Sequence, residues 1–223
     1  MSRIASVAGA LRLTLAIAAA LALAGCAPEQ LAANPLGPCG DDARASGGYV
    51  ELEALLPQTL APGAQAPDRV DSGRSCSDVA LGTLKGHGIT ELRFAGATWN
   101  ETDSEGTVVA VLATPQGVPM LEEAWVEEFY EAGARAGKKT DNIETSRPTI
   151  DLAGEVFRVD ALNDLSLQSV VVWESAGLIH VVIVASDVTP GASPATHDQR
   201  VAFGVAAAVG ATAPSASPAS SAT

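Results

Sequence analysis

The most apolar pair of segments after residue 26 is Gln168-Ser-Val-Val-Val-Trp-Glu-Ser175 and Leu178-Ile-His-Val-Val-Ile-Val-Ala185, with Ala176-Gly177 between them. Val and Ile dominate both segments and favour strands. The two residues between the segments fit a tight hairpin turn. Side chains alternate between the faces of a strand, so the run Val170–Trp173 is apolar on both faces. The stretch therefore predicts an antiparallel hairpin at the centre of a sheet.

Two further hairpins are predicted by apolar segments that flank a turn: Ile89–Trp99 with Thr107–Thr114 around the polar loop Asn100–Gly106, and Thr149–Leu152 with Glu155–Ala161 around Ala153-Gly154. A possible edge strand lies near Arg69-Val70. In the second hairpin, alternation places Phe157, Val159 and Ala161 inward, and Arg158 and Asp160 outward.

Three helices are predicted between these strands. Ser77 offers an N-cap for a short helix through Leu84. Pro119 opens a helix from Met120 to Ala136, with Leu121, Trp125, Phe129, Ala132 and Ala136 on one stripe and Glu122, Glu123, Glu127 and Glu131 on a solvated face. A capping box at Thr196–Gln199 begins the last helix, which ends at Gly210. We expect an α+β fold, in which an antiparallel sheet built of hairpins has two or three helices packed on one face.

The N-terminus has the pattern of an export signal. Arg3 and Arg12 precede the apolar run Leu13–Ala24, which is too short to span a bilayer. The run ends in Leu23-Ala24-Gly25-Cys26, which resembles the lipobox of bacterial lipoproteins. The resemblance implies that the Cys26 thiol receives a diacylglycerol with acyl chains such as palmitate, that the chain is cleaved before Cys26, and that the lipid anchors it in the cell membrane on its extracytoplasmic face. The alternative is an ordinary signal peptide with a chance cysteine.

Two other cysteines, Cys39 and Cys76, follow in a chain that we expect to fold outside the cytoplasm, where disulfides persist. We expect them to form a disulfide bond. A metal site or a reactive thiol is the alternative, although neither cysteine belongs to a CxxC pair or lies near a histidine in sequence.

Composition divides the chain into four parts. Residues 1–25 are the signal peptide, and residues 26–48, rich in Ala, Pro, Gly and Asp, are a lipidated tether. Residues 49–210 form a single globular α+β domain. Residues 211–223, an uncharged run of Ala, Ser, Pro and Thr, are expected to be disordered.

The net charge of the chain is -13. Without Arg3 and Arg12 of the signal peptide, 11 basic residues remain against 26 acidic ones, which gives -15. This balance excludes a nucleic-acid binder, because such proteins need a basic surface. It also predicts repulsion from anionic lipid, so that the domain stands off on its tether and does not lie flat on the membrane.

We identify no catalytic, cofactor-binding or metal-binding residues in the sequence. The three histidines, His87, His180 and His197, lack ligand spacing, and no GxSxG elbow is present. Two acidic groups could bind a cation weakly but match no EF-hand loop: Glu123, Glu127 and Glu131, and Asn100, Asp103 and Glu105.

The segment Leu52-Glu-Ala-Leu-Leu-Pro57 and the order of elements after it resemble uncharacterised α+β domains of bacterial lipoproteins, a resemblance that implies no catalytic residues. Our leading hypothesis is a non-catalytic binding or structural domain of the cell envelope, with an envelope protein as partner. The alternative is a carrier of an apolar, lipid-like ligand in a cavity between sheet and helix, suggested by the two-sided apolar strand Val170–Trp173. A hydrolase assembled by folding is a third hypothesis, and it requires a pocket with convergent His and carboxylate groups.

Overall fold

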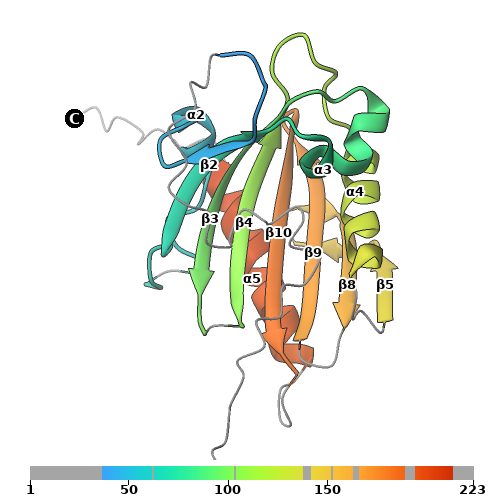
Figure 1. The fold of residues 1–223 in the computed structure, drawn as a ribbon. Helices are drawn as coiled ribbons and strands as arrows, with labels where there is room; N and C mark the ends of the chain where they lie inside the picture. The colour runs from blue at the N-terminus through green and yellow to red at the C-terminus, as the bar shows by residue number, and fades with distance from the viewer. Residues whose placement is uncertain are drawn as a thin grey trace, which may run out of the picture.

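The computed structural model describes residues 37–212, apart from 62, 103, 138–141, 152, 163–165 and 189–193. The described residues form an eight-stranded sheet in which every strand is antiparallel to its neighbours (Figure 1). The order across the sheet is β1 (Ala43–Ala45), β2 (Arg69–Ser75), β3 (Leu92–Asn100), β4 (Gly106–Ala113), β10 (Leu178–Asp187), β9 (Ser166–Ser175), β8 (Phe157–Leu162) and β5 (Asn142–Ser146). The α+β class is confirmed.

The central hairpin is β9 and β10, as predicted. Ten paired positions run from Ser175 opposite Leu178 to Ser166 opposite Asp187. Ala176 and Gly177 have φ angles of 55° and 76°, and a two-residue type I′ turn requires positive values at both positions. Because β10 also pairs with β4, the hairpin lies inside the sheet.

The hairpin of β3 and β4 is also confirmed, with Asn100 opposite Gly106 at its closed end. The strand expected near Arg69-Val70 is longer than predicted and is not at the edge. β2 pairs with β3 on one side and with β1 on the other, so the three-residue β1 is the edge strand.

The hairpin expected from Thr149–Leu152 and Glu155–Ala161 is confirmed only next to its turn, where β6 (Thr149–Ile150) pairs antiparallel with β7 (Gly154–Glu155) as a separate two-stranded ribbon. Its predicted extension to Ala161 is wrong, because β8 pairs with β9 and with the edge strand β5. β5 has the sequence Asn-Ile-Glu-Thr-Ser and is mostly exposed, so it lacks the apolar alternation that would reveal a strand.

One face of the sheet is covered by α4 (Glu123–Ala136), by α3 (Asp78–Leu81) and by the 3₁₀ helix η1 (Gly82–His87). Val170 and Val172 of β9 pack there with Val126 and Tyr130 of α4. Ser77 caps α3 as predicted, since its hydroxyl oxygen accepts a hydrogen bond from Ala80 N–H (3.2 Å).

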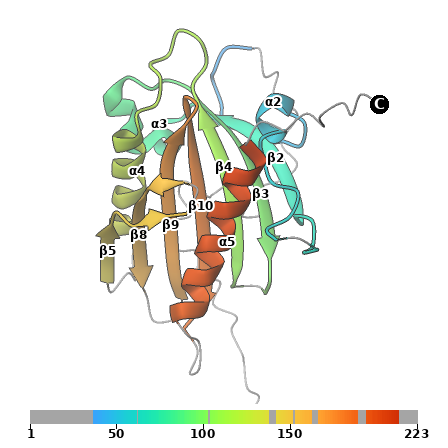
Figure 2. The same cartoon turned by 180° about the vertical axis from the view of Figure 1, so that it is seen from behind.

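The opposite face is covered by α5 (Pro194–Thr212) and α2 (Val50–Glu53). Val171 and Trp173 point to this side and pack in a second cluster with Val201 and Val205 of α5. Figure 1 views the sheet with α5 behind it, and Figure 2 views it with α5 in front. The expectation that all helices lie on one face is therefore corrected, and the helices on both sides explain why β9 is apolar on both faces.

The boundaries of α4 and its buried stripe differ from the prediction. Val118 N–H donates to the Pro115 carbonyl (3.1 Å) in a turn, and the helix begins only at Glu123. Its fully buried apolar residues are Val126, Tyr130 and Ala134, whereas Trp125 and Phe129 lie at the margin of the cluster and Ala136 is exposed.

Two predicted boundaries of the domain move outward. β1 lies within residues 26–48, which were assigned to the tether, so the sheet begins at Ala43. At the other end α5 begins at Pro194, which places Thr196 inside the helix and removes the predicted capping box, and it continues to Thr212. The predicted signal peptide, Cys26 and residues 213–223 lie outside the described residues.

Candidate functional site

The N-terminal part of the described chain is held to the domain by a disulfide. Cys39 and Cys76 are bonded, with 5.7 Å between their Cα atoms and a sequence separation of 37. The predicted pairing is confirmed. Since Cys76 directly follows β2, the bond fixes the N-terminal segment to one end of the sheet.

Asp42 reinforces this attachment from within the same segment. One carboxylate oxygen accepts hydrogen bonds from the backbone N–H groups of Cys76 (2.6 Å) and Ser77 (2.9 Å), and the other accepts from the Ser77 hydroxyl (2.6 Å). Burial alone would raise the pKa of Asp42, but the hydrogen bonds from Ser77 and Cys76 outweigh it and lower the pKa below 3.8. The carboxylate therefore stays charged and holds the start of α3.

Arg74 provides the third attachment. Its guanidinium donates to the carbonyls of Gly37 (2.7 Å) and Pro38 (3.1 Å). The side chain is buried, so these charge-assisted bonds are shielded from water. The far half of the predicted tether is consequently part of the folded domain.

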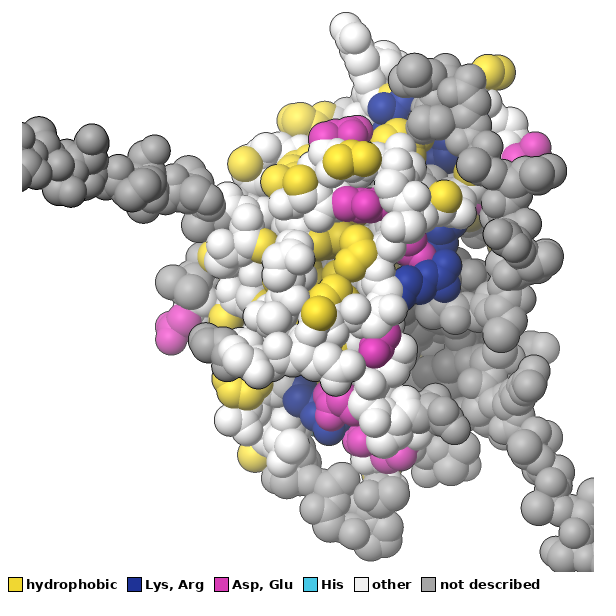
Figure 3. Space-filling view, turned by 90° about the vertical axis from the view of Figure 1, so that its left-hand side faces the viewer, with side chains coloured by type: hydrophobic (Ala, Val, Ile, Leu, Met, Phe, Trp, Pro, Cys, Tyr) yellow, Lys and Arg dark blue, Asp and Glu magenta, His cyan; other side chains and the backbone are white. Residues whose placement is uncertain are grey.

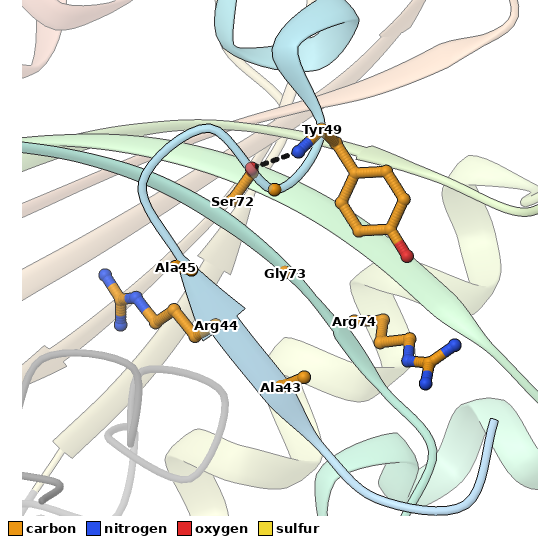
Figure 4. Close-up of a pocket in the computed structure, with 8 residues that line it drawn as sticks. Ala43, Arg44, Ala45, Tyr49, Ser72, Gly73 and Arg74 are labelled. Carbon is orange, nitrogen blue, oxygen red and sulfur yellow. Dashed lines mark hydrogen bonds between the residues drawn. The ribbon is translucent and has the colours of Figure 1, made fainter. Parts of the chain in front are cut away.

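A shallow pocket lies beside this attachment (Figure 4). The Tyr49 N–H donates to the Ser72 hydroxyl oxygen (2.6 Å), and Arg44 and Arg74 point away from each other on opposite sides of the strand pair. The guanidinium carbon of Arg93 lies 5.0 Å from the centre of the Tyr49 ring. Its cavity volume is about 20 Å³, far below the roughly 300–1,000 Å³ of typical ligand sites. The pocket gives no basis for a small-molecule site.

A second polar cluster forms where α5 meets the sheet. The hydroxyl oxygen of Ser169 lies 2.7 Å from His197 Nε2, and its hydroxyl donates to Asp160. Arg158 donates to the same Ser169 oxygen (3.2 Å) and to Asp160 (2.9 Å). On the other side of the ring, His197 Nδ1 lies 2.8 Å from the Ser186 hydroxyl.

The Ser169 and His197 pair has the residue types of a nucleophilic site but not its arrangement. A serine nucleophile transfers its proton to the histidine, whereas Ser169 donates its proton to Asp160. With that assignment, His197 Nε2–H is the donor to Ser169 and Nδ1 accepts from Ser186. Ser169 is 0% exposed and His197 3%, so neither faces a substrate. Burial, and then the positive charge of Arg158, lower the pKa of His197 and favour its neutral form.

This cluster instead joins four elements of the fold. Asp160 belongs to β8, Ser169 to β9, Ser186 to β10 and His197 to α5. Arg158 extends the network to Asp198 on the surface (2.7 Å). Sequence reasoning missed the cluster, because Arg158 and Asp160 looked like outward-facing strand residues and 28 residues separate Ser169 from His197.

The acidic groups considered as weak cation sites have basic partners. Arg200 of α5 binds Glu101 (2.6 Å) and Glu105 (3.2 Å) of the loop between β3 and β4. Glu127, expected on a solvated face, is 9% exposed and pairs with Arg147 (2.5 Å). Asp103 lies outside the described residues. Within the described ranges, no group of three or more His, Cys, Asp or Glu side chains could hold a metal ion.

The three histidines lie in separate surroundings. His87 stacks on Trp125, with ring centres 4.8 Å apart, and its Nε2 lies 2.8 Å from Glu128. His180 is buried and stacks on Trp173 (5.2 Å), and burial lowers its pKa. The fold therefore does not bring His87, His180 and His197 together.

No family model, curated protein or solved structure matches the chain. In the part of the chain that the structure describes, no helix combines the length and hydropathy needed to span a membrane.

Proposed function

We propose that this protein is a lipid-anchored domain of the cell envelope. In this proposal, acyl chains on Cys26 hold it on the extracytoplasmic face of the cell membrane, where it binds another envelope component without catalysing a reaction. The observation that carries the proposal is Leu23-Ala24-Gly25-Cys26 behind two basic residues and an apolar run of about a dozen residues.

The disulfide supports export. Disulfides persist in oxidising compartments and are rare in the cytosol. The bond between Cys39 and Cys76 therefore suits a domain that folds outside the cytoplasm, and it also fixes the chain 13 residues after Cys26, the site of the expected anchor.

The described polar clusters hold the fold together, which supports the non-catalytic part of the proposal. In the cluster at α5, Ser169 and His197 are buried and their polar atoms have internal partners. At the other end, Asp42 and Arg74 are engaged in holding the N-terminal segment. The described polar side chains that could be taken for catalytic residues thus all have structural partners.

We do not extend the proposal to carriage of an apolar ligand. That hypothesis rested on the strand Val170–Trp173, which is apolar on both faces. Val170, Val171 and Val172 are each 0% exposed, because helices pack on both sides of the strand. Packing of the core accounts for the feature that had suggested a ligand.

Acylation is tested by growing cells that produce the full chain with an alkyne fatty acid and detecting label on the purified protein. The wild type and a Cys39→Ser/Cys76→Ser control should carry label, and Cys26→Ser should carry none. Protease added to cells from which the outer layers have been removed should digest the wild-type domain. Label that persists in Cys26→Ser, or is missing from the wild type, would contradict the anchor. Resistance to protease in a membrane-bound, folded protein would contradict its placement.

A further inference from the structure

Large apolar side chains are unevenly exposed on this domain. Among the described residues the three most exposed are Val79 (83%), Met120 (69%) and Val50 (65%). The other exposed large apolar side chains, at 37% to 47%, are Leu162, Val188 and Phe203. Apolar side chains exposed singly are normal on a protein surface, so the informative feature is whether the most exposed ones lie together.

The three most exposed side chains share one end of the molecule, which we call the tether end. It carries residues 37–42, α2, α3, the loop 114–122 and the turn between β9 and β10, all at the top of Figure 1. Val50 lies in α2, and Val79 lies in α3, three residues after Cys76. Met120 lies beside the β9–β10 turn, since a Cβ atom placed on Gly177 would be 4.0 Å from its sulfur.

The other exposed apolar side chains are away from the tether end. Val188 follows β10, whose last residue lies at the opposite end of the sheet, and Leu162 ends β8 at that same end. Phe203 lies midway along α5. Figure 3 shows the side of the molecule that carries α2: apolar side chains are exposed from its upper half to its lower part with acidic and basic side chains among them, and charged side chains of both signs also meet near its lower end.

The length of chain before the described residues limits how the domain can sit on a membrane. Eleven residues separate Cys26 from Gly37, which Arg74 and the nearby disulfide hold at the tether end. Fully extended, eleven residues span at most about 40 Å. A ten-residue strand such as β10 is itself about 33 Å long. The tether end therefore faces the anchor, and the opposite end could reach the bilayer only if nearly the whole connection ran back along the sheet.

We propose that the tether end contacts the phospholipid bilayer, with Val50, Val79 and Met120 in the boundary between headgroups and acyl chains. This inference rests on the proposed acylation of Cys26, which brings the domain to the membrane. The contact is end-on and confined to one tip, which agrees with the expectation that an acidic domain does not lie flat. It revises the expectation that the domain stands clear of the lipid.

Two of the acidic side chains near these residues have local partners, whereas Asp41, Glu51 and Glu122 are exposed at the same end. Asp78, beside Val79, forms an ion pair with Lys85. Glu53 of α2 accepts hydrogen bonds from Gly47 N–H and the Ser72 hydroxyl, both at 2.7 Å. Partners of this kind lower the electrostatic cost of bringing the tip to a headgroup layer.

The test places a photo-crosslinking phenylalanine analogue, one position at a time, in the full acylated chain in phosphatidylcholine vesicles. Residues 79 and 120 are the test positions, and residues 188 and 203 are matched controls because they are also exposed and apolar. Illumination followed by mass spectrometry should find phospholipid adducts at residues 79 and 120 and no adduct at residues 188 and 203. The same spectra report the acyl chains on Cys26.

Each other result contradicts a separate step. Acylated protein with no lipid adduct at 79 and 120, or with equal adduct at all four positions, overturns the membrane contact while the proposed anchor stands. Absence of acyl chains on Cys26 refutes the anchor and the contact with it. When the same variants are illuminated in intact cells, protein adducts in place of lipid adducts at 79 and 120 overturn the contact in favour of a protein partner.

Discussion

Opening the disulfide should destabilise the domain by an amount that follows from the length of its loop. The Cys39→Ala/Cys76→Ala variant releases a loop that spans 37 residues and contains β1, α2 and β2. In the chain-entropy model, closing such a loop removes about 13 cal/mol/K from the unfolded chain, or about 4 kcal/mol at 25 °C. A domain of this size has a total stability on the order of 5–15 kcal/mol, so the loss is a large share of it.

Urea unfolding measures the loss through the fluorescence of Trp99, Trp125 and Trp173, which are buried or partly buried in the two core clusters. For a urea m-value of about 2 kcal/mol/M, a loss of about 4 kcal/mol lowers the midpoint by about 2 M. Wild-type protein unfolded in the presence of a thiol reductant is the matched control, and its midpoint should equal that of the double variant without reductant.

A loss of stability below about 1 kcal/mol would contradict stabilisation by loop closure, since it is far under the expected value. A wild-type midpoint that reductant does not change would refute it independently. Either result would mean that the disulfide does not close the loop in the unfolded chain. The hydrogen bonds of Asp42 and Arg74 would then hold the N-terminal segment in the folded state without it.

Three further predictions concern single residues. Asp42→Asn should lower the free energy of unfolding by about 1–3 kcal/mol at neutral pH, because it replaces a carboxylate that accepts three hydrogen bonds with a neutral amide. The lowered pKa of Asp42 contributes stability above pH 3.8 that is lost as pH falls through the folded-state pKa, so urea midpoints of the variant should fall less in acid. The folded-state pKa of His197 is below 6.5, so its contribution to the free energy of unfolding is complete above pH 6.5 and declines below it. The melting temperature of His197→Asn should therefore fall less steeply with decreasing pH than that of the wild type. The buried His180, whose pKa is also lowered, should maintain part of the pH dependence in this variant. Gly204→Ala in α5 should destabilise the domain by about 1–3 kcal/mol in urea unfolding, since the new Cβ would lie 2.6 Å from a Val182 methyl. Gly133→Ala in α4, where the new Cβ would meet open space, should stabilise the domain by about 0.5–1 kcal/mol in the same assay.

Each of these has a result that would contradict it. Equal acid sensitivity of Asp42→Asn and wild type would mean that another group controls the acid transition. An unchanged pH slope in His197→Asn would mean that this ring is not held neutral. If Gly204→Ala and Gly133→Ala had the same effect, the close approach of α5 to Val182 would not limit the size of residue 204.

Local patterns predicted the strands that pair with a neighbour in sequence. The β9–β10 and β3–β4 hairpins follow from apolar segments on either side of a short connection, and both were predicted correctly. The pairing of β8 with β5 was missed, because a polar edge strand leaves no periodic signal and its choice of partner depends on the rest of the sheet.

The arrangement of helices on two faces was present in the sequence but was read differently. Val170, Val171 and Val172 in succession indicate a strand that is buried on both sides. The same run also suggests the alternative hypothesis of an apolar ligand beside the sheet, whereas in the structure α4 and α5 cover the two faces.

Of the candidate site, only the disulfide could be predicted, because the sequence allows its two cysteines a single pairing. Cys39 and Cys76 could pair in one way, and they do so. The partners of Asp42, Arg74 and Ser169 come from distant positions in the chain, so their hydrogen bonds arise from tertiary packing that no spacing rule encodes.

The disulfide also determines how the domain would respond to a mechanical pull. If Cys26 is anchored, any force between the membrane and a bound partner enters the fold at Cys39 and passes across the sulfur bridge to Cys76. β1 and α2 lie inside the bridged loop, so the pull bypasses them. The three-residue edge strand β1, which would be the first to peel from the sheet, is thus relieved of load, and tension reaches the sheet at the end of an interior strand.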